Sequence, residues 1–344
     1  MQRLLPIASG KGGVGKSVLS ANLGLALSRL GKTVILVDLD LGGSNLHTCL
    51  GLRNRHPGLG SFAWKTEKNL ASLLVETGYE RLWLIPGDNL MPGTANLEWN
   101  VKRRIVKELS NLPADFVILD LGAGSSYNVV DFWLAAPDGL LVICPEITSA
   151  LNAYSFLKTA SFRVLMRAFR DGSAERAEIL AYAGTKTEGS GQSFMDFAVD
   201  LAARFPDSGP AALESLKAIG PRVVVNRGRA SADAELGYRL RDISRKNLGI
   251  TPSFAAFLLE DESVPRSVAM RVPLLAEDPS SPFARGVQAL ATRLATATVT
   301  AAAPTVYAGE EGEADTPPAP GGDGRDPELE RLAAEALATG TGQV

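Results

Sequence analysis

The chain has 344 residues, of which 45% are hydrophobic and 21% charged, and its formal net charge is −3. This length and composition are ordinary for a globular protein with a substantial core and do not require a nucleic-acid or membrane partner. The two cysteines, Cys49 and Cys144, lie in separate apolar runs, which argues against a disulfide framework and for a reducing compartment. No stretch reaches the roughly 18 consecutive apolar residues of a spanning helix, so we expect a cytoplasmic protein.

Short apolar runs rich in Val, Ile and Leu recur along the chain and alternate with amphipathic stretches such as residues 18–30. Such runs are typical of parallel strands buried on both faces, and the β-α-β-α order predicts an α/β fold. We expect a doubly wound, mostly parallel sheet with helices on both faces. The predicted strands are residues 4–8, 33–37, 82–85, 116–119, 139–144, 223–225 and 254–258.

Residues 171–221 interrupt this alternation, because about fifty residues separate two elements that a short crossover would join. Two helices are expected there from apolar residues at helical spacing, namely Phe194, Phe197, Leu201 and Phe205 in the first and Leu213, Leu216 and Ile219 in the second. We predict a helical insertion that caps its own small core and offers a surface to a partner.

The composition changes from about residue 295 to Ala, Thr, Pro, Gly and acidic residues, which bury too little apolar surface to order themselves. We therefore expect one domain, residues 1–295, followed by a disordered tail, residues 296–344, with a short helix at 327–338. Nine acidic residues and two arginines from Pro304 onward give the tail a charge of −7, which leaves +4 for the rest of the chain.

A glycine-rich segment, GKGGVGKS, follows the first predicted strand and opens the first predicted helix. It fits the phosphate-loop pattern, and its place between strand and helix makes the match specific. Glycines let backbone N–H groups point at phosphate oxygens, and the helix start adds its positive dipole end. Lys16 is expected on the β- and γ-phosphates, with the Ser17 hydroxyl on Mg²⁺. The predicted nucleotide-binding residues are Gly10, Lys11, Gly12, Gly13, Val14, Gly15, Lys16, Ser17 and Val18.

Three aspartates follow predicted strands. Asp38 and Asp40 lie in VILVDLDLGGSN, and because alternate residues of a strand share a face, both can point toward the phosphate end of the sheet. Asp120 ends the run FVILD, so an apolar strand places its carboxylate at the start of a glycine-containing loop. A carboxylate in the second coordination shell of Mg²⁺ and a γ-phosphate-sensing switch both require this position. One such aspartate often only caps a helix, but three after parallel strands predict a shared site.

Four segments together, GKGGVGKS, DLDLGGSN, ILDLGAG and VVVNR, resemble the deviant phosphate-loop ATPases of the MinD/ParA group. The resemblance covers residues 4–170 and 222–295. Within the group, DLDLGGSNLHTCLGL and PEITSALNAYSFLK are most similar to the FlhG subgroup, which regulates flagellar number and placement. The resemblance implies a P-loop NTPase fold that binds ATP and Mg²⁺.

The resemblance also implies roles for single residues. Lys11 matches a lysine that reaches across a nucleotide-sandwich homodimer to the γ-phosphate in the other subunit. Asp40 matches the residue that orients the attacking water, and Asp38 and Asp120 match the magnesium-shell carboxylates. The residues expected to act in catalysis are therefore Lys11, Lys16 and Asp40.

Further positions are assigned by the same resemblance. Asn45 falls in the first switch loop, and Gly122 in the switch that follows Asp120. Asn226 and Arg227 match the adenine-contacting loop, and residues 260–274 match the segment that closes the base pocket. For Asn226, a polar residue that only ends a buried strand is an equal alternative.

We therefore expect a Mg²⁺-dependent ATPase switch, dimeric with ATP and monomeric with ADP, that positions a cellular structure. Flagellar number or placement, or a cell pole or division site, is the expected target; the sequence does not identify the effector or activator. Hydrolysis should be slow, because the only candidate base is a carboxylate that acts mainly by positioning water.

Two other functions stay open. A ParA-type partitioning ATPase would bind nucleoid DNA through a basic surface, made either by Lys102, Arg103, Arg104 and Lys107 or by Arg239, Arg241, Arg245 and Lys246. We favour a solvated helix face for both sets. A nucleotide-dependent scaffold that never hydrolyses ATP is the other function, although Lys16 and Asp40 favour turnover. An iron–sulfur carrier is disfavoured, because no CxxC pair occurs.

MinD and FlhG end in a basic amphipathic helix that lies on the membrane. In this chain the predicted helix 327–338 has an apolar stripe, Leu329, Leu332 and Leu337, beside Glu328, Glu330 and Glu335. Anionic lipid attracts Lys and Arg, so the charge has the wrong sign. A peripheral position at the inner face of the membrane or at a cell pole is left open, and docking of this helix on a protein partner is the alternative.

Overall fold

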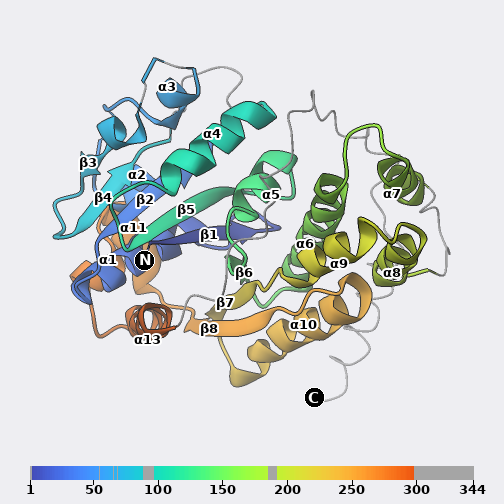
Figure 1. Cartoon of the computed structure of the whole chain (residues 1–344). Coiled ribbons are helices and arrows are strands. Elements are labelled where there is room, and N and C mark those ends of the chain that lie inside the picture. The colour runs from blue at the N-terminus through green and yellow to red at the C-terminus, as the bar shows by residue number, and fades with distance from the viewer. Residues whose placement is uncertain are drawn as a thin grey trace.

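The computed structural model describes residues 2–53, 55–64, 66–67, 69–87, 97–184 and 192–297. These residues form an eight-stranded sheet with the order β3-β4-β2-β5-β1-β6-β7-β8 (Figure 1), in which only β3 and β4 pair antiparallel. The strands are β1 Arg3–Ser9, β2 Val34–Leu39, β3 Val75–Glu76, β4 Leu82–Ile85, β5 Phe116–Ala123, β6 Leu140–Ile143, β7 Arg222–Gly228 and β8 Ser253–Leu259. All seven predicted strands are present, which confirms the doubly wound α/β fold.

Helices cover both faces of the sheet because the central strands are apolar on both sides (Figure 1). Val117 and Leu119 of β5 belong to the core of one face, beneath α4 Trp99–Leu109, α5 Tyr127–Trp133, α6 Ile147–Ala168 and α10 Glu235–Leu248. Phe116 and Ile118 belong to the core of the other, beneath α1 Lys16–Arg29, α11 Ser263–Met270, α12 Leu274–Glu277 and α13 Pro282–Thr296. Neighbouring residues alternate between the two cores because successive side chains of a strand point to opposite faces of the sheet.

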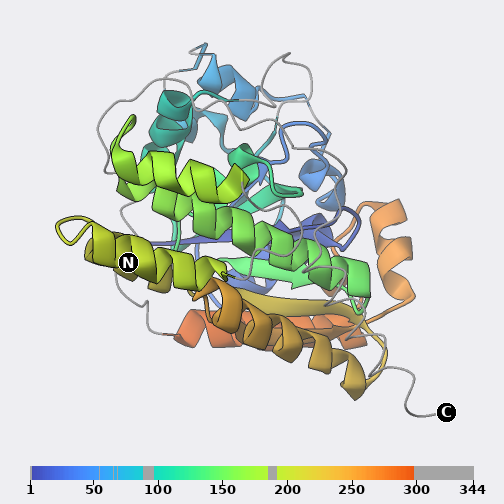
Figure 2. The same cartoon turned by 90° about the vertical axis from the view of Figure 1, so that its right-hand side faces the viewer.

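The insertion contains three helices, α7 Ala174–Gly184, α8 Phe194–Arg204 and α9 Gly209–Lys217, which lie beside α6 and α10 (Figure 2). The prediction of a separate small core is wrong. Phe194, Leu201 and Leu216 belong to the same apolar core as α6 and the sheet. Phe162 of α6 lies 4.7 Å from Phe194, ring centre to ring centre, so the aromatic residues of α8 pack on the long helix beneath them. The insertion therefore widens the main core.

Four short elements complete the described part of the chain: α2 Leu46–Cys49, α3 Leu59–Ala63 and the 3₁₀ helices η1 Leu70–Leu73 and η2 Ser231–Ala234. The two-residue strand β3 has no counterpart among the predicted strands, because two residues carry no alternation to recognise. Among the described residues, no helix is long and apolar enough to cross a bilayer. The helix predicted at 327–338 lies outside the described residues, and the domain boundary near 295 stays a prediction.

Candidate functional site

The phosphate loop connects the carboxyl end of β1 to the first turn of α1, and Gly13 and Gly15 in it have φ angles of 79° and 92°. These left-handed values favour glycine. Gly10 is needed for a different reason, since a Cβ there would lie 2.1 Å from the carbonyl oxygen of Asn152. The loop therefore has the backbone shape that exposes N–H groups at a helix start, where anions bind.

The Lys16 side chain is nearly buried, and its Nζ donates a hydrogen bond to Ser9 Oγ at 3.0 Å. Ser9 Oγ in turn donates to the Lys11 carbonyl oxygen at 2.7 Å. The hydroxyl of this β1 residue therefore connects the strand to two residues of the phosphate loop. Burial lowers the pKa of Lys16, while the negative charges of Asp120 and Asp40 act in the opposite direction. An anion beside Nζ would relieve this desolvation, as a nucleotide phosphate does in phosphate loops.

Asp38 lies at the carboxyl end of β2 and is 1% exposed. Its carboxylate accepts hydrogen bonds from Ser44 Oγ at 2.5 Å and from the backbone N–H groups of Leu46 and Asp40, both at 3.1 Å. Burial, followed by the charge of Asp120, raises the pKa of Asp38 to about 7. The segment predicted as the first switch is thus tied directly to this carboxylate.

Asp120 lies beside Asp38 in the neighbouring strand β5 and is also buried. Its Oδ1 accepts a hydrogen bond from Ser20 Oγ at 3.0 Å, whereas its buried Oδ2 has no hydrogen-bond partner among the described residues. Burial raises the pKa of Asp120 to about 6, against the effect of the nearby Ser17 hydroxyl. Burial disfavours the charged forms of these two adjacent carboxylates, so a cation bound beside them would favour their ionised forms.

The donor set fits Mg²⁺. The ion prefers oxygen ligands and in proteins takes one or two carboxylates, with substrate phosphates and water completing its shell. The free Oδ2 of Asp120, the Ser17 hydroxyl and Asp38 supply that chemistry at one end of the sheet. The described residues contain no cluster of three or more His, Cys, Asp or Glu side chains that could hold a metal ion alone.

Asp40 lies one residue beyond β2 and faces two glycines. A Cβ at Gly122 would approach Asp40 Oδ1 to 3.3 Å, and one at Gly43 would approach it to 3.6 Å. Gly122 is within β5, which extends three residues past Asp120, so the switch glycine predicted in a loop lies in a strand. Asn45 precedes α2 and is exposed, and its Nδ2 donates to the Gly43 carbonyl oxygen at 2.6 Å.

Lys11 has different surroundings from Lys16, although the same loop carries both. Its Nζ donates to Glu146 Oε2 at 2.6 Å and to Thr148 Oγ1 at 3.1 Å. Glu146 precedes α6, and the Lys11 and Glu146 side chains are 38% and 50% exposed. The hydrogen bond from Lys11 lowers the pKa of Glu146. Lys11 is thus held at the rim of the site, away from the buried carboxylates.

Asn226 and Arg227 at the end of β7 differ in their contacts. Asn226 is 5% exposed, and its Nδ2 donates to the Val14 carbonyl oxygen of the phosphate loop at 2.7 Å. A Cβ at Gly15 would lie 2.6 Å from the same nitrogen, so Asn226 packs against the loop. Arg227 has a φ of 61° and forms an ion pair with Glu260 at 3.1 Å, beyond the end of β8. The predicted contact of both residues with adenine stays a prediction.

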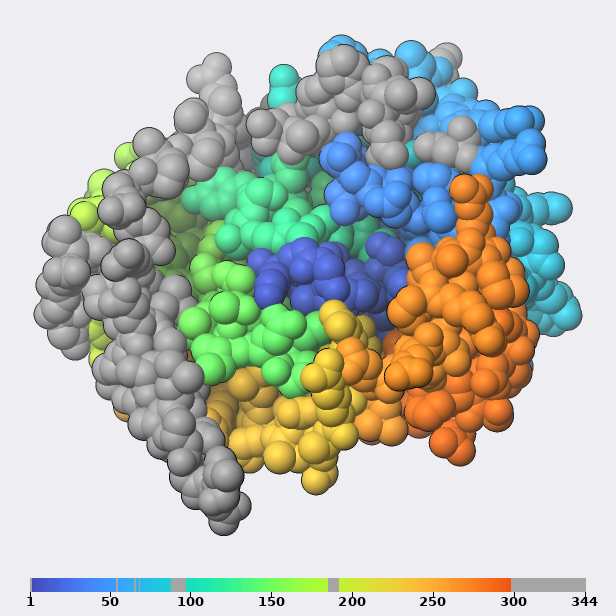
Figure 3. Space-filling view, turned by 180° about the vertical axis from the view of Figure 1, so that it is seen from behind, coloured from blue at the N-terminus to red at the C-terminus, as the bar shows by residue number. Residues whose placement is uncertain are grey.

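Figure 3 shows how the chain gathers these residues on one face. The dark blue phosphate loop lies at the centre, surrounded by the segments that follow β2 in blue, β5 and β6 in green, β7 in yellow and β8 in orange. The carboxyl ends of parallel strands meet at one edge of a sheet, and ligands bind there in open α/β folds. Sequence reasoning missed four polar side chains at this edge: Ser9, Ser20, Ser44 and Glu146.

In the first basic set considered for DNA, Lys102 and Arg104 are engaged in contacts within the protein. Lys102 is 4% exposed and its Nζ forms an ion pair with the fully buried Asp131. The guanidinium of Arg104 lies over the Phe62 ring at 4.4 Å and donates to the Phe62 carbonyl oxygen. The prediction of a solvated face at Lys102 is wrong, because α4 turns this residue inward toward α5.

The second basic set lies on α10. Arg239 and Arg241 are partly neutralised by Glu235 at 3.5 Å and Asp242 at 3.2 Å. Arg245 and Lys246 in the last turn are exposed, and no ion pair is found for either among the described residues. Cations in a last helical turn also stabilise the helix dipole, so this set is typical of a solvated helix end.

The edge of the sheet at β1 and β5 has the form shared by phosphate-loop nucleotide-binding proteins, with a buried loop lysine beside paired carboxylates. A model of the CobQ/CobB/MinD/ParA nucleotide binding domain matches residues 5–274. The chain belongs to this family.

Relatives of known name fall within the same group. The chain is 32% identical over 181 residues to the antiactivator FleN of Pseudomonas aeruginosa, which covers 52% of this chain and 61% of FleN. It is 35% identical over 155 residues to the septum site-determining protein MinD of Bacillus subtilis, covering 44% of this chain and 57% of that MinD. The chain thus spans less than two thirds of the curated relatives it matches.

The fold is shared with MinD of Pyrococcus horikoshii, solved in complex with Mg-ADP. That structure has a TM-score of 0.57 and 20% identity, and it covers 86% of this chain and 97% of its own. The likeness confirms the fold.

Proposed function

We propose that the protein is a Mg²⁺-dependent ATPase that forms a homodimer with ATP and returns to a monomer with ADP. One observation supports the proposal most strongly: two lysines of one loop have separate surroundings. Lys16 is buried near Asp120 and Asp40, whereas Lys11 is held at the rim by Glu146. A single lysine is enough to hold the phosphates within one subunit, so Lys11 is available for a contact outside it.

Within one subunit, the loop N–H groups and Lys16 bind the β- and γ-phosphates. Asp38 and Asp120, whose pKa values burial raises, would hold Mg²⁺ together with the Ser17 hydroxyl. The ion, when bound, neutralises charge on the phosphates and on these carboxylates. The hydrogen bonds from Ser44 and Leu46 to Asp38 would keep the first switch segment at the site.

Asp40 would orient a water molecule against the γ-phosphorus. The water oxygen forms the new P–O bond, the bond to the bridging β–γ oxygen breaks, and ADP leaves with phosphate as the other product. The main effect of Asp40 would be to hold this water in line with the bond that breaks. Turnover should be slow, and the ATP-bound state should last long enough to act as a signal.

Lys11 would report the γ-phosphate to the partner subunit. A hydrogen bond to a charged group contributes about 1.5–3 kcal/mol, and a symmetric dimer makes two such bonds. To shift the equilibrium from almost all monomer to almost all dimer, the free energy of dimerisation must differ by about 5.5 kcal/mol between the ADP and ATP states. Two Lys11 contacts present with ATP and absent with ADP therefore supply much of the required difference.

The relatives support a proposal for the cellular role. Similarity to FleN, an antiactivator, and to MinD, a septum site-determining protein, supports a switch that regulates the number or place of a cellular structure. We propose flagellar number or placement first and division-site positioning second. We place the protein in the cytoplasm, with peripheral membrane or polar binding through a partner that the sequence does not name.

Phosphate release from Mg·ATP by the purified protein tests the proposal. Lys16→Ala should lose nucleotide binding, whereas Lys107→Ala, an exposed lysine on α4, should retain it. Asp40→Ala should bind ATP and hydrolyse it far more slowly. Binding without turnover in the unmodified protein would instead identify a non-hydrolysing scaffold, and absence of nucleotide binding would contradict the proposal altogether.

A further inference from the structure

Two helices on opposite faces of the sheet, α10 and α13, end at the edge opposite the phosphate loop. Both contact β8, the last strand of the sheet, which lies between them in Figure 1. Near the end of α13, the Leu294 carbonyl oxygen accepts a hydrogen bond at 3.0 Å from Nη1 of Arg3, the first residue of β1. α10 ends at Leu248, five residues before Ser253, whose N–H donates to the Pro221 carbonyl oxygen just ahead of β7. The last turns of both helices therefore lie at the amino ends of the strands.

Three exposed cations lie in these two last turns. Arg245 and Lys246 belong to α10 and Arg293 to α13, and no ion pair is found for any of them within the part of the chain that the structure describes. The residues that follow each turn, 249–253 and 294–297, carry no charged side chain. Arg245, Lys246 and Arg293 thus make the end of the sheet beside β8 basic, and we call them the basic edge.

The helix dipoles account for only part of this charge. The C-terminus of a helix carries roughly half a negative charge, and cations in the last turn are stabilising there. Two helix ends therefore offset about one of the three positive charges and leave about two. At an ionic strength of 0.1 M such charge acts over about 10 Å. The basic edge therefore attracts an anionic group from outside the described residues.

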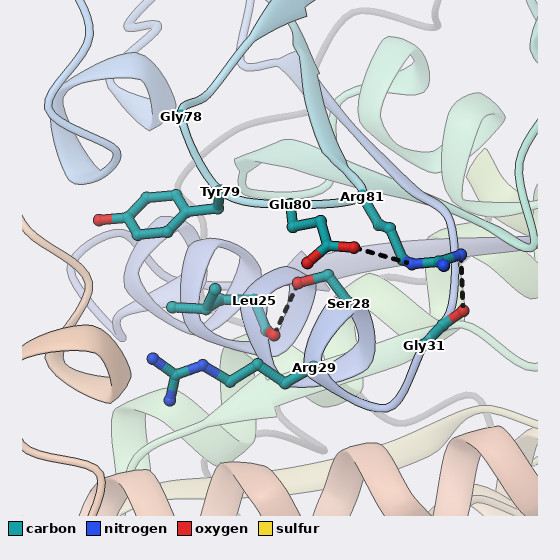
Figure 4. Close-up of a pocket in the computed structure, with 8 residues that line it drawn as sticks. All are labelled: Leu25, Ser28, Arg29, Gly31, Gly78, Tyr79, Glu80 and Arg81. Carbon is teal, nitrogen blue, oxygen red and sulfur yellow. Dashed lines mark hydrogen bonds and ion pairs between the residues drawn. The ribbon is translucent and has the colours of Figure 1, made fainter.

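A hollow beside α1, at the same end of the sheet, does not share this property. Arg29 and Arg81 line it, but Glu80 lines it too. Figure 4 shows the two guanidinium groups pointing to opposite sides, with Arg81 directed at Glu80 and at the Gly31 carbonyl oxygen. Arg29 donates to the Leu275 carbonyl oxygen at 2.8 Å. An anionic segment would meet a carboxylate in this hollow, so the basic edge is the better partner for it.

The chain itself continues beyond α13 with an acidic segment. Residues 298–344 lie outside the described residues, and the charge of −7 from Pro304 onward stands against +4 for the rest of the chain. The run EEGEAD, residues 310–315, has four acidic residues in six and no basic one. The acidic residues after it are interspersed with Arg325 and Arg331. Residues 310–315 therefore have the charge that the basic edge lacks.

The acidic run is within reach of both helix ends. Twelve residues, 298–309, join Ala297 to it, and a chain of this length spans about 20 Å on average and about 40 Å when fully extended. Attachment through such a linker gives an effective concentration on the order of millimolar. A free anion at a lower concentration would therefore compete poorly with the run for the basic edge.

We propose that residues 310–315 bind the basic edge of the same chain. Their carboxylates pair with the guanidinium groups of Arg245 and Arg293 and with the ammonium group of Lys246. Each pair is exposed and therefore weak, and salt screens it. The contact covers cations that a polyanion such as a nucleic acid would otherwise use, so the acidic run limits the binding of polyanions to the full-length chain. The proposal does not rest on nucleotide binding, because the basic edge lies at the other end of the sheet.

Carbodiimide coupling of the full-length protein tests the contact. The reagent joins a lysine amine directly to a carboxylate that touches it, and peptide mass spectrometry identifies the pair. We expect Lys246 to couple to residues 310–315 about tenfold more than Lys107 does, as two or three exposed ion pairs together would give. The ratio should approach one near 1 M salt, where charges act over only about 3 Å.

Lys107 is the matched control for this experiment. It is exposed in the last turn of α4, and the carbonyl oxygen of Leu109 in the same turn accepts a hydrogen bond from Gln2 Nε2, next to the start of β1. Lys107 therefore lies near the same end of the sheet. Equal coupling of Lys246 and Lys107 would overturn the proposal. Coupling found only between chains, in a mixture of ¹⁵N-labelled and unlabelled protein, would overturn binding within one chain and identify a second copy as the partner.

The affinity of the full-length protein for a polyanion gives a second test, measured as the fluorescence anisotropy of a labelled oligothymidylate strand. One variant neutralises the acidic run by Glu310→Gln, Glu311→Gln and Glu313→Gln. Its control neutralises three other acidic residues of the tail by Asp323→Asn, Asp326→Asn and Glu328→Gln. We expect the first variant to bind about tenfold more tightly than the parent and the control to bind like the parent. Adding Arg245→Gln and Lys246→Gln to the first variant should remove the gain.

The matched change in net charge separates a specific contact from general repulsion. If both variants gained the same affinity, the net charge alone would explain the result and the proposal would be overturned. A first variant that binds the strand no more tightly than the parent would overturn the shielding of the basic edge from polyanions.

Discussion

Lys11 Nζ lies 2.6 Å from Glu146 Oε2, so a lysine at the start of the phosphate loop is held by the residue before α6 in the same subunit. Both side chains are more than a third exposed, and ion pairs in such surroundings contribute little to stability. The contact can therefore open at small cost. We interpret it as the resting position of a side chain whose proposed task is in the dimer.

Glu146→Gln should favour the dimer. The substitution removes the charge that holds Lys11 and leaves the shape of the loop, so Lys11 becomes freer to reach the partner subunit. Sedimentation at several protein concentrations with Mg·ATP should show half-dimerisation at a concentration about twofold to thirtyfold lower, the range expected when each of the two subunits loses one exposed ion pair.

The matched control is Glu214→Gln, which breaks the exposed pair of Glu214 with Lys217 on α9 and should change nothing. A Glu146→Gln protein that dimerises less readily than the parent would show that Glu146 supports the dimer interface instead of restraining Lys11.

Asp131→Ala should destabilise the fold severely. Asp131 is fully buried and accepts from Arg163 Nε at 2.7 Å, with Arg167 at 2.5 Å and Lys102 as further partners. Removing it leaves three cations without their shared carboxylate, a kind of change that costs about 3–5 kcal/mol. Urea unfolding should report this loss, whereas Asp171→Ala, which breaks an exposed pair with Arg176, should stay within about 0.5 kcal/mol of the parent.

The same residue gives a pH dependence with a definite sign. Burial acts to raise the pKa of Asp131, but Arg167, Arg163 and Lys102 outweigh it, and the pKa is lowered from its usual value of 3.8. The stabilising contribution is therefore complete above pH 3.8 and is lost as the pH falls through the lower folded-state pKa. Unfolding of the parent should become easier in acid over that range, and the Asp131→Ala protein should lack this component.

Asn226→Ala should weaken nucleotide binding through the loop. The substitution removes the hydrogen bond to the Val14 carbonyl oxygen, and one neutral hydrogen bond corresponds to about threefold to tenfold in affinity. Titration with ADP and GDP should show both affinities falling by the same factor. Asn247→Ala, a buried amide near the end of α10, should affect neither. A selective loss of ADP over GDP would instead support a direct contact between Asn226 and adenine.

The sequence predicted the sheet well because its strands are apolar runs separated by recognisable breaks. The seven runs correspond to strands β1, β2 and β4 to β8, and the glycine pattern predicted the loop between β1 and α1. The insertion was predicted less well, since helical spacing at Phe194 and Leu201 shows that a face is apolar but not which core it joins. The prediction of a solvated face at Lys102 failed for a similar reason, because the sequence does not show that Asp131 lies opposite this lysine in the fold.

At the site, residue type identified the charged groups but not their partners. Lys16, Asp38, Asp40 and Asp120 come together at one edge because parallel strands end there. Serines such as Ser44 and Ser20 carry no pattern of their own, and their importance depends on which carboxylate they meet. The contact between Glu146 and Lys11 could not be predicted from the sequence either, because 135 residues separate the two.

Light scattering of Asp40→Ala and of Lys11→Ala/Asp40→Ala, each saturated with Mg·ATP, tests the central claim most directly. Slow hydrolysis in the Asp40→Ala background keeps the nucleotide intact, and Lys16 binds it in both proteins. We predict the mass of a dimer for Asp40→Ala and the mass of a monomer for the double variant, with ATP bound to both. A double variant that still has the dimer mass would contradict the proposal that Lys11 joins the two subunits.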